Sequence, residues 1–213
     1  MATIAVIDYD MGNLHSACKG LQNAGAQTIV TDEAKEIATA DGIVLPGVGS
    51  FDPAMRHIRS RQLESVIADG LASGKPFLGI CLGLQVLFES SSEGVEPGLG
   101  LFKGTVEKFK PEPEITIPHM GWNQLQIRDV NFPLWQNLSP NPWLYFVHSY
   151  YVLPTDSSIQ AATITHGSQT VTAAIARDNI MAVQFHPEKS STDGLRLLSN
   201  FVALVNQRQP LTI

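Results

Sequence analysis

The stretch KPFLGICLGLQ places Cys81 between Gly79 and Gly83. A short apolar run of strand character leads into the cysteine, and apolar residues as far as Phe88 predict a helix after it. A strand that turns sharply into a helix holds its corner residue in a strained, exposed position, and the flanking glycines leave room for such a corner. The pattern predicts a nucleophile elbow whose helix N-terminus favours the thiolate. Taken alone, it fits a buried cysteine beside packing glycines equally well.

A second chemical site follows the predicted strand at 180–185, which delivers His186-Pro187-Glu188. Pro187 fixes the backbone between the two polar residues. A histidine at a strand end, two residues from a carboxylate, suits a general base whose ring Glu188 orients. A lone His-Pro-Glu is more often a surface turn. Beside an elbow cysteine it predicts acyl transfer through a thioester, in which His186 passes the proton to the leaving group.

The glycine-rich segment 45–50, LPGVGS, follows another apolar run. Acyl transfer needs backbone N–H donors aimed at the developing oxyanion, and glycines let the backbone turn an N–H inward. The candidate donors are Val48, Gly49 and Leu82, the residue after the nucleophile. The glycines on both sides of Val48 would also allow its peptide to flip, pointing the N–H towards the oxyanion in one state and away in the other. A phosphate loop is disfavoured because no Lys-Ser/Thr follows, and a plain turn remains an alternative.

The composition is that of a globular protein: 213 residues, 44% hydrophobic and 16% charged. A net charge of -6 without any Lys/Arg run argues against a nucleic-acid partner. Two cysteines could pair on count alone, but Cys18 falls on the apolar face of a predicted helix. The start MATIAVIDYD lacks the basic and apolar regions of a secretion signal, and no apolar run approaches the ~20 residues of a membrane span. We expect a reduced, cytoplasmic protein.

The first half alternates predicted strands and helices, and the second half is rich in short strands. Strands at 3–7, 27–31 and 42–45 and helices at 14–21 and 63–71 predict a parallel sheet covered on both faces. The strand before Cys81 is expected at its centre, where ligands gather at the carboxyl ends. A polar loop at 90–100 carries Glu93, and a helix from about Asp193 ends the chain. Further strand-like pieces lie at 105–109, 124–127, 143–147, 161–165, 170–176 and 181–185, separated by proline-marked turns.

Three motifs in this order, PGVGSF, GICLGLQ and QFHPEKS, resemble the class I (triad-type) glutamine amidotransferases. Within that family, IDYDMGNLHS, PHMGWN and VHSYY are similar to the glutaminase subunits of imidazole glycerol phosphate synthase. The related glutaminases of anthranilate, GMP and pyridoxal phosphate synthesis differ in these flanking motifs. The resemblance covers nearly the whole chain. It implies a single α/β amidotransferase domain over residues 1–213, with a mixed, mostly parallel sheet flanked by helices and an added antiparallel region.

The resemblance also implies roles for individual residues. Cys81, His186 and Glu188 would be the triad that hydrolyses glutamine to glutamate and ammonia. Glu93 would hold the α-ammonium of the substrate, although a solvated loop acid is the alternative. The family uses no cofactor in this half, and the remaining histidines lack metal-ligand spacing with the cysteines, so we expect no metal. The glutamine-binding set would be Gln85, Glu93, His148, Ser149 and Tyr150, with His148 alternatively a packed structural histidine.

A partner follows from the chemistry of ammonia, which is mostly protonated in neutral water and then no longer nucleophilic. The resemblance implies a separate (β/α)8-barrel cyclase subunit of imidazole glycerol phosphate synthase, which forms a heterodimer with this chain and receives its ammonia by channelling. The cyclase would make imidazole glycerol phosphate and an aminoimidazole carboxamide ribotide in histidine biosynthesis. Trp122 is the expected anchor because aromatic residues are enriched among interface hot spots, with a core tryptophan as the alternative. The candidate contact residues are Asn13, Met120, Trp122, Asn123 and Lys189.

Two other classes of protein remain open. A stand-alone cysteine hydrolase acting on γ-glutamyl bonds or peptides would share the elbow and the histidine but would turn over without a partner. A non-catalytic flavodoxin-like binding module would share the fold alone. The presence of Cys81, His186 and Glu188 together argues against the binding module.

Overall fold

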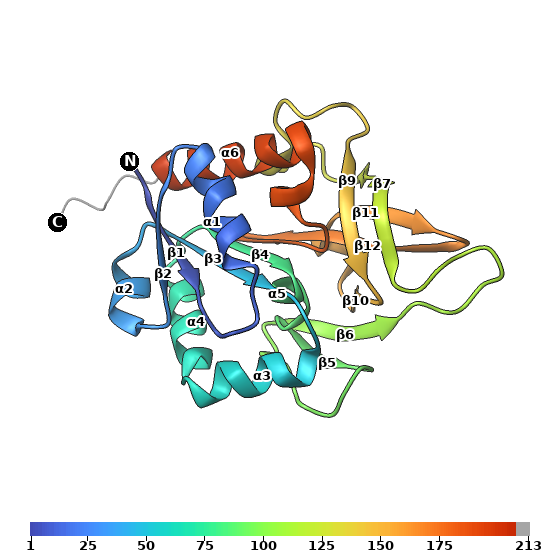
Figure 1. Ribbon diagram of the computed structural model, residues 1–213, viewed down its shortest axis with the longest axis horizontal. Helices are drawn as coiled ribbons and strands as arrows, with labels where there is room; N and C mark the ends of the chain where they lie inside the picture. Colours follow the sequence, from blue (N-terminus) through green and yellow to red (C-terminus); the bar gives the residue numbers. More distant parts are fainter. Residues whose placement is uncertain (208–213) are drawn as a thin grey trace.

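One large mixed β-sheet crosses the part of the chain that the structure describes, residues 1–207 of a computed structural model (Figure 1). Its strands are β1 (Thr3–Ile7), β2 (Gln27–Thr31), β3 (Gly42–Gly47), β4 (Phe77–Cys81), β8 (Gln126–Ile127), β11 (Gln160–His166), β12 (Gln169–Arg177) and β13 (Ile180–Val183). They lie in the order β2-β1-β3-β4-β13-β12-β11-β8. Neighbours from β2 to β13 are parallel, and the remaining pairs are antiparallel. The strand that ends at Cys81 is therefore central, as predicted.

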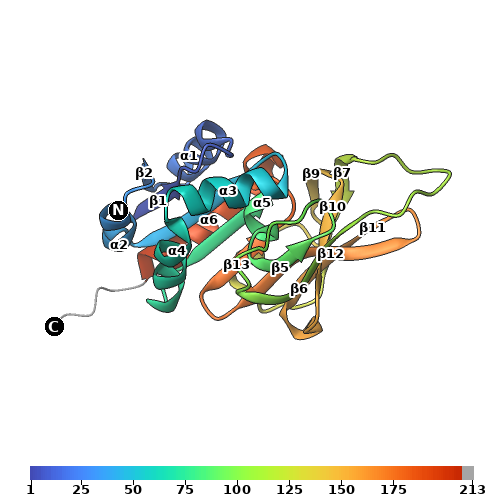
Figure 2. The same cartoon turned by 90° about the horizontal axis from the view of Figure 1, so that it is seen from below.

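Helices cover both faces of this sheet. They are α1 (Leu14–Asn23), α2 (Ala34–Thr39), α3 (Phe51–Ser60), α4 (Leu63–Ala72), α5 (Leu82–Gln85) and α6 (Ser191–Gln207). One face is covered by α1 and α6, and the other by α2, α3 and α4 (Figures 1 and 2). Because both faces are covered, β3 and β4 are buried along their whole length and read as continuous apolar runs. No helix within residues 1–207 is long and apolar enough to cross a membrane.

Two smaller sheets stand beside the large one at the carboxyl ends of its parallel strands (Figure 1). The first contains β5 (Phe88–Ser91), β6 (Phe102–Lys108) and β10 (Tyr150–Pro154), in the order β10-β6-β5. The second pairs β7 (His119–Gln124) with β9 (Trp143–His148). Short 3-10 helices lie at Pro133–Trp135, Ser157–Ile159 and Pro187–Lys189. Since β9 runs directly into β10, residues 148–150 lie where the chain passes from one small sheet to the other.

The structure corrects two expectations about local elements. The helix predicted to run from Cys81 to about Phe88 is a single turn, α5, because Phe88 begins β5. A short apolar run fits a helix or a buried strand by periodicity alone, and the tertiary packing decided between them. The first two residues of the predicted loop at 90–100, Ser90 and Ser91, belong to β5 because they pair with β6. The helices α2 and α3 were missed: α2 has six residues and one buried side chain, Ile37, which gives no periodic signal.

Helix α1 shows how local signals and packing agree. It begins after Asn13, whose side-chain oxygen accepts the N–H of Ser16, and it ends before Gly25, which has φ +90°. Its buried face carries Ala17, Cys18 and Leu21, as the helical spacing predicted. Both cysteines of the chain are free and buried.

Candidate active site

Cys81 sits at a strained corner at the end of β4. Its backbone has φ 56° and ψ -108°, a conformation that costs free energy for any residue other than glycine. A Cβ atom at Gly83 would overlap the carbonyl oxygen of Leu45, and one at Gly79 would lie 2.8 Å from the carbonyl oxygen of Gly83. The predicted elbow is therefore present, and close packing against β3 holds it. Because α5 is a single turn of four residues, the dipole of a long helix does not act on the thiol.

His186 and Glu188 form a buried pair beside the elbow. The Nδ1 atom of His186 lies 2.8 Å from Oε1 of Glu188, and the two side chains are 2% and 3% exposed. A carboxylate only accepts hydrogen bonds, so Nδ1 carries the proton of this bond. Burial lowers the pKa of His186, but Cys81 and Glu188 together outweigh it and raise the pKa to about 9. At neutral pH the ring is therefore an imidazolium.

The Nε2 atom of His186 is the end of the ring that is free for chemistry. It is buried and makes no hydrogen bond of acceptable geometry to any described residue. Cys81 is nevertheless close enough to act on the pKa of the ring. Such a contact is expected to tighten once a substrate is bound. Nε2 is thus the atom that can exchange a proton with the sulfur or with a leaving group.

The backbone around His186 is fixed from β9. The N–H of His186 donates to the carbonyl oxygen of Tyr145 at 2.9 Å. The hydroxyl of Ser190 donates to the carbonyl oxygen of His186 at 2.6 Å and accepts the N–H of Tyr145 at 2.9 Å. These bonds hold the turn after β13 and set the position of the imidazole.

The predicted oxyanion loop differs from the elbow, because one of its N–H groups is already bonded within the chain. The N–H of Val48 donates to the carbonyl oxygen of Met11 at 2.6 Å, and Gly49 has φ +105°. Of the predicted donors, Val48 therefore has its N–H committed elsewhere in the chain in this conformation. This corresponds to the away state of the predicted peptide flip.

A cavity of about 250 Å³ lies in front of Cys81 and His186. Pro118 and Val147, which were not predicted for the site, also line it. The cavity brings together the residues predicted for the oxyanion and glutamine-binding sets: Val48, Gly49, Leu82, Gln85, Glu93, His148, Ser149 and Tyr150. Residues from both halves of the chain thus meet at the carboxyl end of β4, where an α/β sheet gathers its ligands.

Two of the cavity residues have part of their hydrogen-bonding capacity already used. Oε2 of Glu93 accepts the N–H of Phe51 at 2.8 Å, at the start of α3, so one carboxylate oxygen remains for a ligand. Nε2 of Gln85 donates to the carbonyl oxygen of Tyr150 and to Oε1 of Gln184, both at 3.0 Å. Since both amide hydrogens are used, Gln85 can only accept a hydrogen bond from a ligand.

The side chain of His148 packs inside the protein, although the residue borders the cavity. Burial lowers the pKa of His148 to about 3 and that of His119 to about 4, so both rings are neutral. Nδ1 of His148 donates to the carbonyl oxygen of Tyr150 at 2.8 Å, and Nε2 lies 3.2 Å from Nδ1 of His119. The structural alternative therefore holds for this side chain.

Sequence reasoning missed Gln184. This residue is completely buried, and its Nε2 lies 3.5 Å from the Sγ atom of Cys81. A signal was present, because a carboxamide within the apolar run at 180–185 must find a polar partner once the strand is buried.

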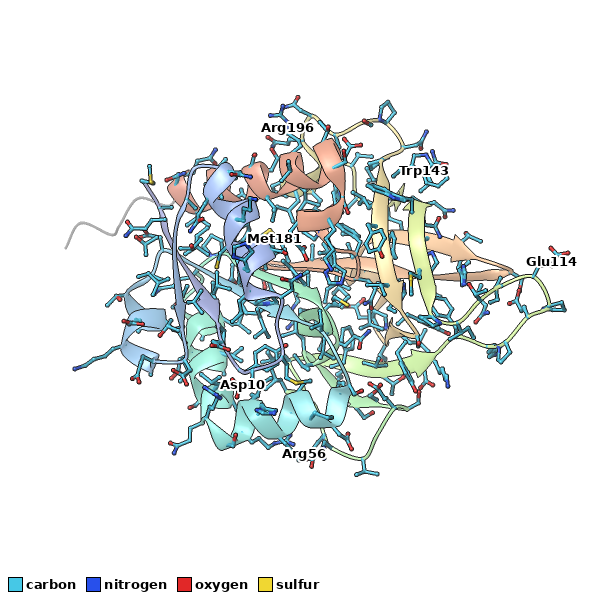
Figure 3. All side chains as sticks on the ribbon, viewed as in Figure 1. Asp10, Arg56, Glu114, Trp143, Met181 and Arg196 are labelled. Atoms are coloured by element: carbon cyan, nitrogen blue, oxygen red, sulfur yellow. The ribbon has the colours of Figure 1, made fainter. Side chains whose placement is uncertain are left out.

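The candidate partner residues divide into exposed and internally bonded groups. On β7, Met120 is 62% and Trp122 is 49% exposed, so the alternative of a core tryptophan is wrong. Lys189 is exposed after His186. Neighbouring β9 adds Trp143, 54% exposed, which Figure 3 shows at the edge of this sheet. Two large aromatic side chains and a methionine thus lie open on adjacent strands.

The carboxamides of the other two candidates bond within the chain. The side chain of Asn13 caps α1 through Ser16. Nδ2 of Asn123 donates to the carbonyl oxygen of Thr165 at 2.9 Å and lies 3.3 Å from Nε2 of His119. Any contact that they make with a partner must compete with these bonds.

No three His, Cys, Asp or Glu side chains in residues 1–207 converge in a way that could hold a metal ion. The cavity offers a thiol, an imidazole paired with a carboxylate, and backbone N–H groups. A strained cysteine elbow in an α/β sheet, facing such a pair, is typical of enzymes that act through a cysteine nucleophile.

The chain belongs to the class I glutamine amidotransferase family, whose model, "Glutamine amidotransferase class-I", matches residues 5–205. Among curated proteins it is 70% identical to the imidazole glycerol phosphate synthase subunit HisH of Cyanothece sp., over 96% of this chain and 97% of that one. The HisH subunit of Nostoc punctiforme is 66% identical, over 99% and 100% of the two chains.

Solved structures share the fold at low sequence identity. A solved glutamine amidotransferase aligns with a TM-score of 0.72 at 17% identity and covers 95% of this chain and 98% of that one. A chain of the PurLQS structure from Thermotoga maritima aligns with a TM-score of 0.71 at 18% identity, with coverages of 95% and 99%. These similarities confirm the predicted α/β amidotransferase fold.

Proposed function

We propose that this chain is the glutaminase subunit of an imidazole glycerol phosphate synthase. It hydrolyses glutamine to glutamate and ammonia and passes the ammonia to a (β/α)8-barrel cyclase subunit of histidine biosynthesis. One observation carries the proposal: Cys81, the His186–Glu188 pair and the predicted glutamine-binding groups meet at one cavity. The identity of 70% to a HisH subunit along nearly the whole chain supports the choice of acceptor.

The triad of Cys81, His186 and Glu188 would act in two steps. The thiolate attacks the carboxamide carbon of glutamine and forms a tetrahedral oxyanion. His186 gives its Nε2 proton to the leaving nitrogen, ammonia departs and a thioester remains. Neutral His186 then takes a proton from water, the hydroxide adds to the thioester, and glutamate leaves as the thiolate re-forms. Glu188 keeps the proton on Nδ1 and stabilises the imidazolium throughout.

The substrate would be held by groups with unused capacity. The free oxygen of Glu93 suits the α-ammonium, and the N–H groups of the segment 148–150 suit the α-carboxylate. Gln85 would accept through Oε1, the only hydrogen-bonding atom of its carboxamide that is left. The oxyanion would be stabilised by the N–H of Leu82 and, after its peptide turns, by that of Val48.

The partner would cover the face built from β7 and β9. Exposed Met120 and Trp122 are the proposed anchors, because large exposed apolar and aromatic side chains dominate binding energy in protein interfaces. Lys189 would supply a charge at the same face, and Asn13 and Asn123 would contribute at its margin. A cyclase bound over this face would keep the released ammonia out of water, where protonation would remove its nucleophilicity.

The cyclase would also switch the glutaminase on. With its N–H bound to Met11, Val48 offers no donor to an oxyanion. Loss of one such donor costs about 2.7–4 kcal/mol, or roughly a hundred- to a thousandfold in turnover. A partner that stabilises the turned peptide would recover that factor.

The cytoplasmic location, the extent of the domain over residues 1–213 and the lack of a cofactor remain predictions.

Glutamate release distinguishes this function from a stand-alone cysteine hydrolase. The rate is measured for the chain alone, with the cyclase, and with the cyclase plus its nucleotide substrate, using a γ-glutamyl dipeptide as the control substrate. We expect slow release by the chain alone, a rise of roughly a hundredfold or more in the full mixture, and little turnover of the dipeptide. Equal rates in all three mixtures would contradict the switch, and fast dipeptide turnover would favour the stand-alone hydrolase.

A further inference from the structure

Gln184 brings a carboxamide to the nucleophile from the strand beside β4. Val183 of β13 pairs with Ile80 of β4. The residues that follow them, Gln184 and Cys81, therefore lie close together where the two strands end. The backbone N–H of Gln184 donates to the carbonyl oxygen of Ala173 at 2.8 Å, which fixes its main chain. The side chain is 0% exposed, and its Nε2 lies 3.5 Å from Sγ of Cys81.

The orientation of this carboxamide follows from its neighbours. The carbonyl oxygen of Tyr150 can only accept, so Gln85 must direct its NH₂ group towards it. That NH₂ group also reaches Oε1 of Gln184 at 3.0 Å, which leaves the NH₂ group of Gln184 on the side of the sulfur. Gln85 therefore holds Gln184 with a donor, and not an acceptor, towards Cys81.

A buried carboxamide needs partners for its own sake, and that alone would make Gln184 structural. The sulfur gives it a second role. Cys81 is only 7% exposed, so water has little access to its sulfur, and a buried charge without hydrogen bonds is costly. His186 already interacts with the sulfur, since Cys81 raises the pKa of its ring, and Gln184 adds an amide N–H whose nitrogen lies 3.5 Å from Sγ.

We propose that Gln184 is a further catalytic residue, whose amide N–H stabilises the Cys81 thiolate, and that Gln85 positions it for this task. The role rests on the proposed glutaminase function and deepens it. Before attack, the donor raises the fraction of Cys81 present as thiolate. During hydrolysis of the thioester, the same donor stabilises the sulfur as it leaves the tetrahedral carbon and recovers the electron pair of the C–S bond.

Alkylation of Cys81 by iodoacetamide reports the thiolate without any substrate. The rate is measured against pH on the full chain, with modification assigned to Cys81 by peptide mass spectrometry. For Gln184→Met, which keeps the length and removes the donor, we expect the midpoint of the profile to rise by about one pH unit. At pH values well below both midpoints the rate then falls about tenfold, the factor that corresponds to about 1.4 kcal/mol.

Two further variants and a matched control keep the test decisive. Gln184→Glu places acceptors against the sulfur and is expected to raise the midpoint further. Gln184→Asn keeps a carboxamide but withdraws it, and a rise in the same direction is expected. Gln160→Met makes the same substitution on β11, where Nε2 donates to Oγ1 of Thr172, and is expected to leave the profile unchanged. Thermal melting confirms which variants are folded.

An alkylation profile that overlays the unsubstituted profile in the folded Gln184 variants would overturn the proposal, even if glutamate release falls. A fall in release with unchanged alkylation means that Gln184 only shapes the cavity. The proposed function fails by a different result, which is no glutamate release by the unsubstituted chain with its cyclase. Because alkylation needs neither glutamine nor a partner, the two failures are distinguishable.

Discussion

The two sides of the cavity are prepared to different degrees. On one side, close packing of Gly83 against β3 holds Cys81 at its corner, and Nδ1 of buried His186 lies 2.8 Å from Oε1 of Glu188. On the other side, the oxyanion loop has the N–H of Val48 bound to the carbonyl oxygen of Met11. The side chains of the predicted site are assembled, and one of its predicted backbone donors is bonded elsewhere.

The difference has a physical basis. The elbow at Cys81 depends on close packing, since a side chain at Gly83 would overlap the main chain of β3. A peptide between two glycines can exchange one hydrogen-bond partner for another with little strain. Turning this peptide would therefore change the oxyanion donor at a small cost in free energy while the predicted nucleophile and base stay fixed. Four predictions test this contrast, from the largest expected effect to the smallest.

Replacement of the nucleophile tests the fixed side. Cys81→Ala is expected to reduce glutamine-dependent synthesis by the complex by about 10⁴-fold or more, because the covalent route is lost. Synthesis driven by added ammonium at high pH should remain, since the thiol acts only in releasing ammonia. The two rates are measured on the same preparation. Substantial product from glutamine would mean that Cys81 is not the nucleophile.

Removal of the withheld donor tests the switchable side. Val48→Pro has no backbone N–H, so the ratio of cyclase-activated to unactivated glutamate release is expected to fall by roughly a hundred- to a thousandfold. Val48→Ala keeps the N–H and serves as the matched control, with the ratio preserved. Steady-state glutamate release with and without the cyclase gives both ratios. Full activation of Val48→Pro would show that this peptide is not the switch.

Neutralising the orienting carboxylate sharpens the role of the buried pair. Glu188→Gln removes a charge-assisted hydrogen bond worth about 1.5–3 kcal/mol, so kcat is expected to fall about ten- to a hundredfold. The KM for glutamine should change little, because Glu188 contacts the base and not the substrate. Steady-state kinetics of the complex separate the two constants. A change confined to KM would make Glu188 a binding residue.

The titration of His186 measures how strongly Cys81 and Glu188 stabilise its charged ring. Its folded pKa of about 9 lies above the unfolded value near 6.5, so the charged ring contributes stability that is fully present below about pH 6.5 and lost as the pH rises through about 9. In Cys81→Ala the midpoint is expected to fall, because one source of the increase is removed. NMR of the imidazole follows both proteins. An unchanged midpoint would assign the whole increase to Glu188.

Much of the site was predictable from the chain alone. The glycines around Cys81 and the proline between His186 and Glu188 act over a few residues, so their consequences can be inferred locally. The continuous apolar runs predicted buried parallel strands, and such a sheet brings the ends of β4 and β13 together. The length of α5 was predicted wrongly because the apolar run after Cys81 fits two elements, and β6 supplied the partner that made its end a strand.

Sequence by itself thus determined the class of fold and predicted a nucleophile and its base, because each depends on short spacing or on strand periodicity. Tertiary structure decided the rest. The carboxamide of Gln184 reaches Cys81 from a position 103 residues away, and Trp122 proved exposed on β7. The partner of the Val48 N–H is set by Met11 in another loop. Hydrogen-bond partners and exposure are properties of neighbours in space, and local spacing does not specify them.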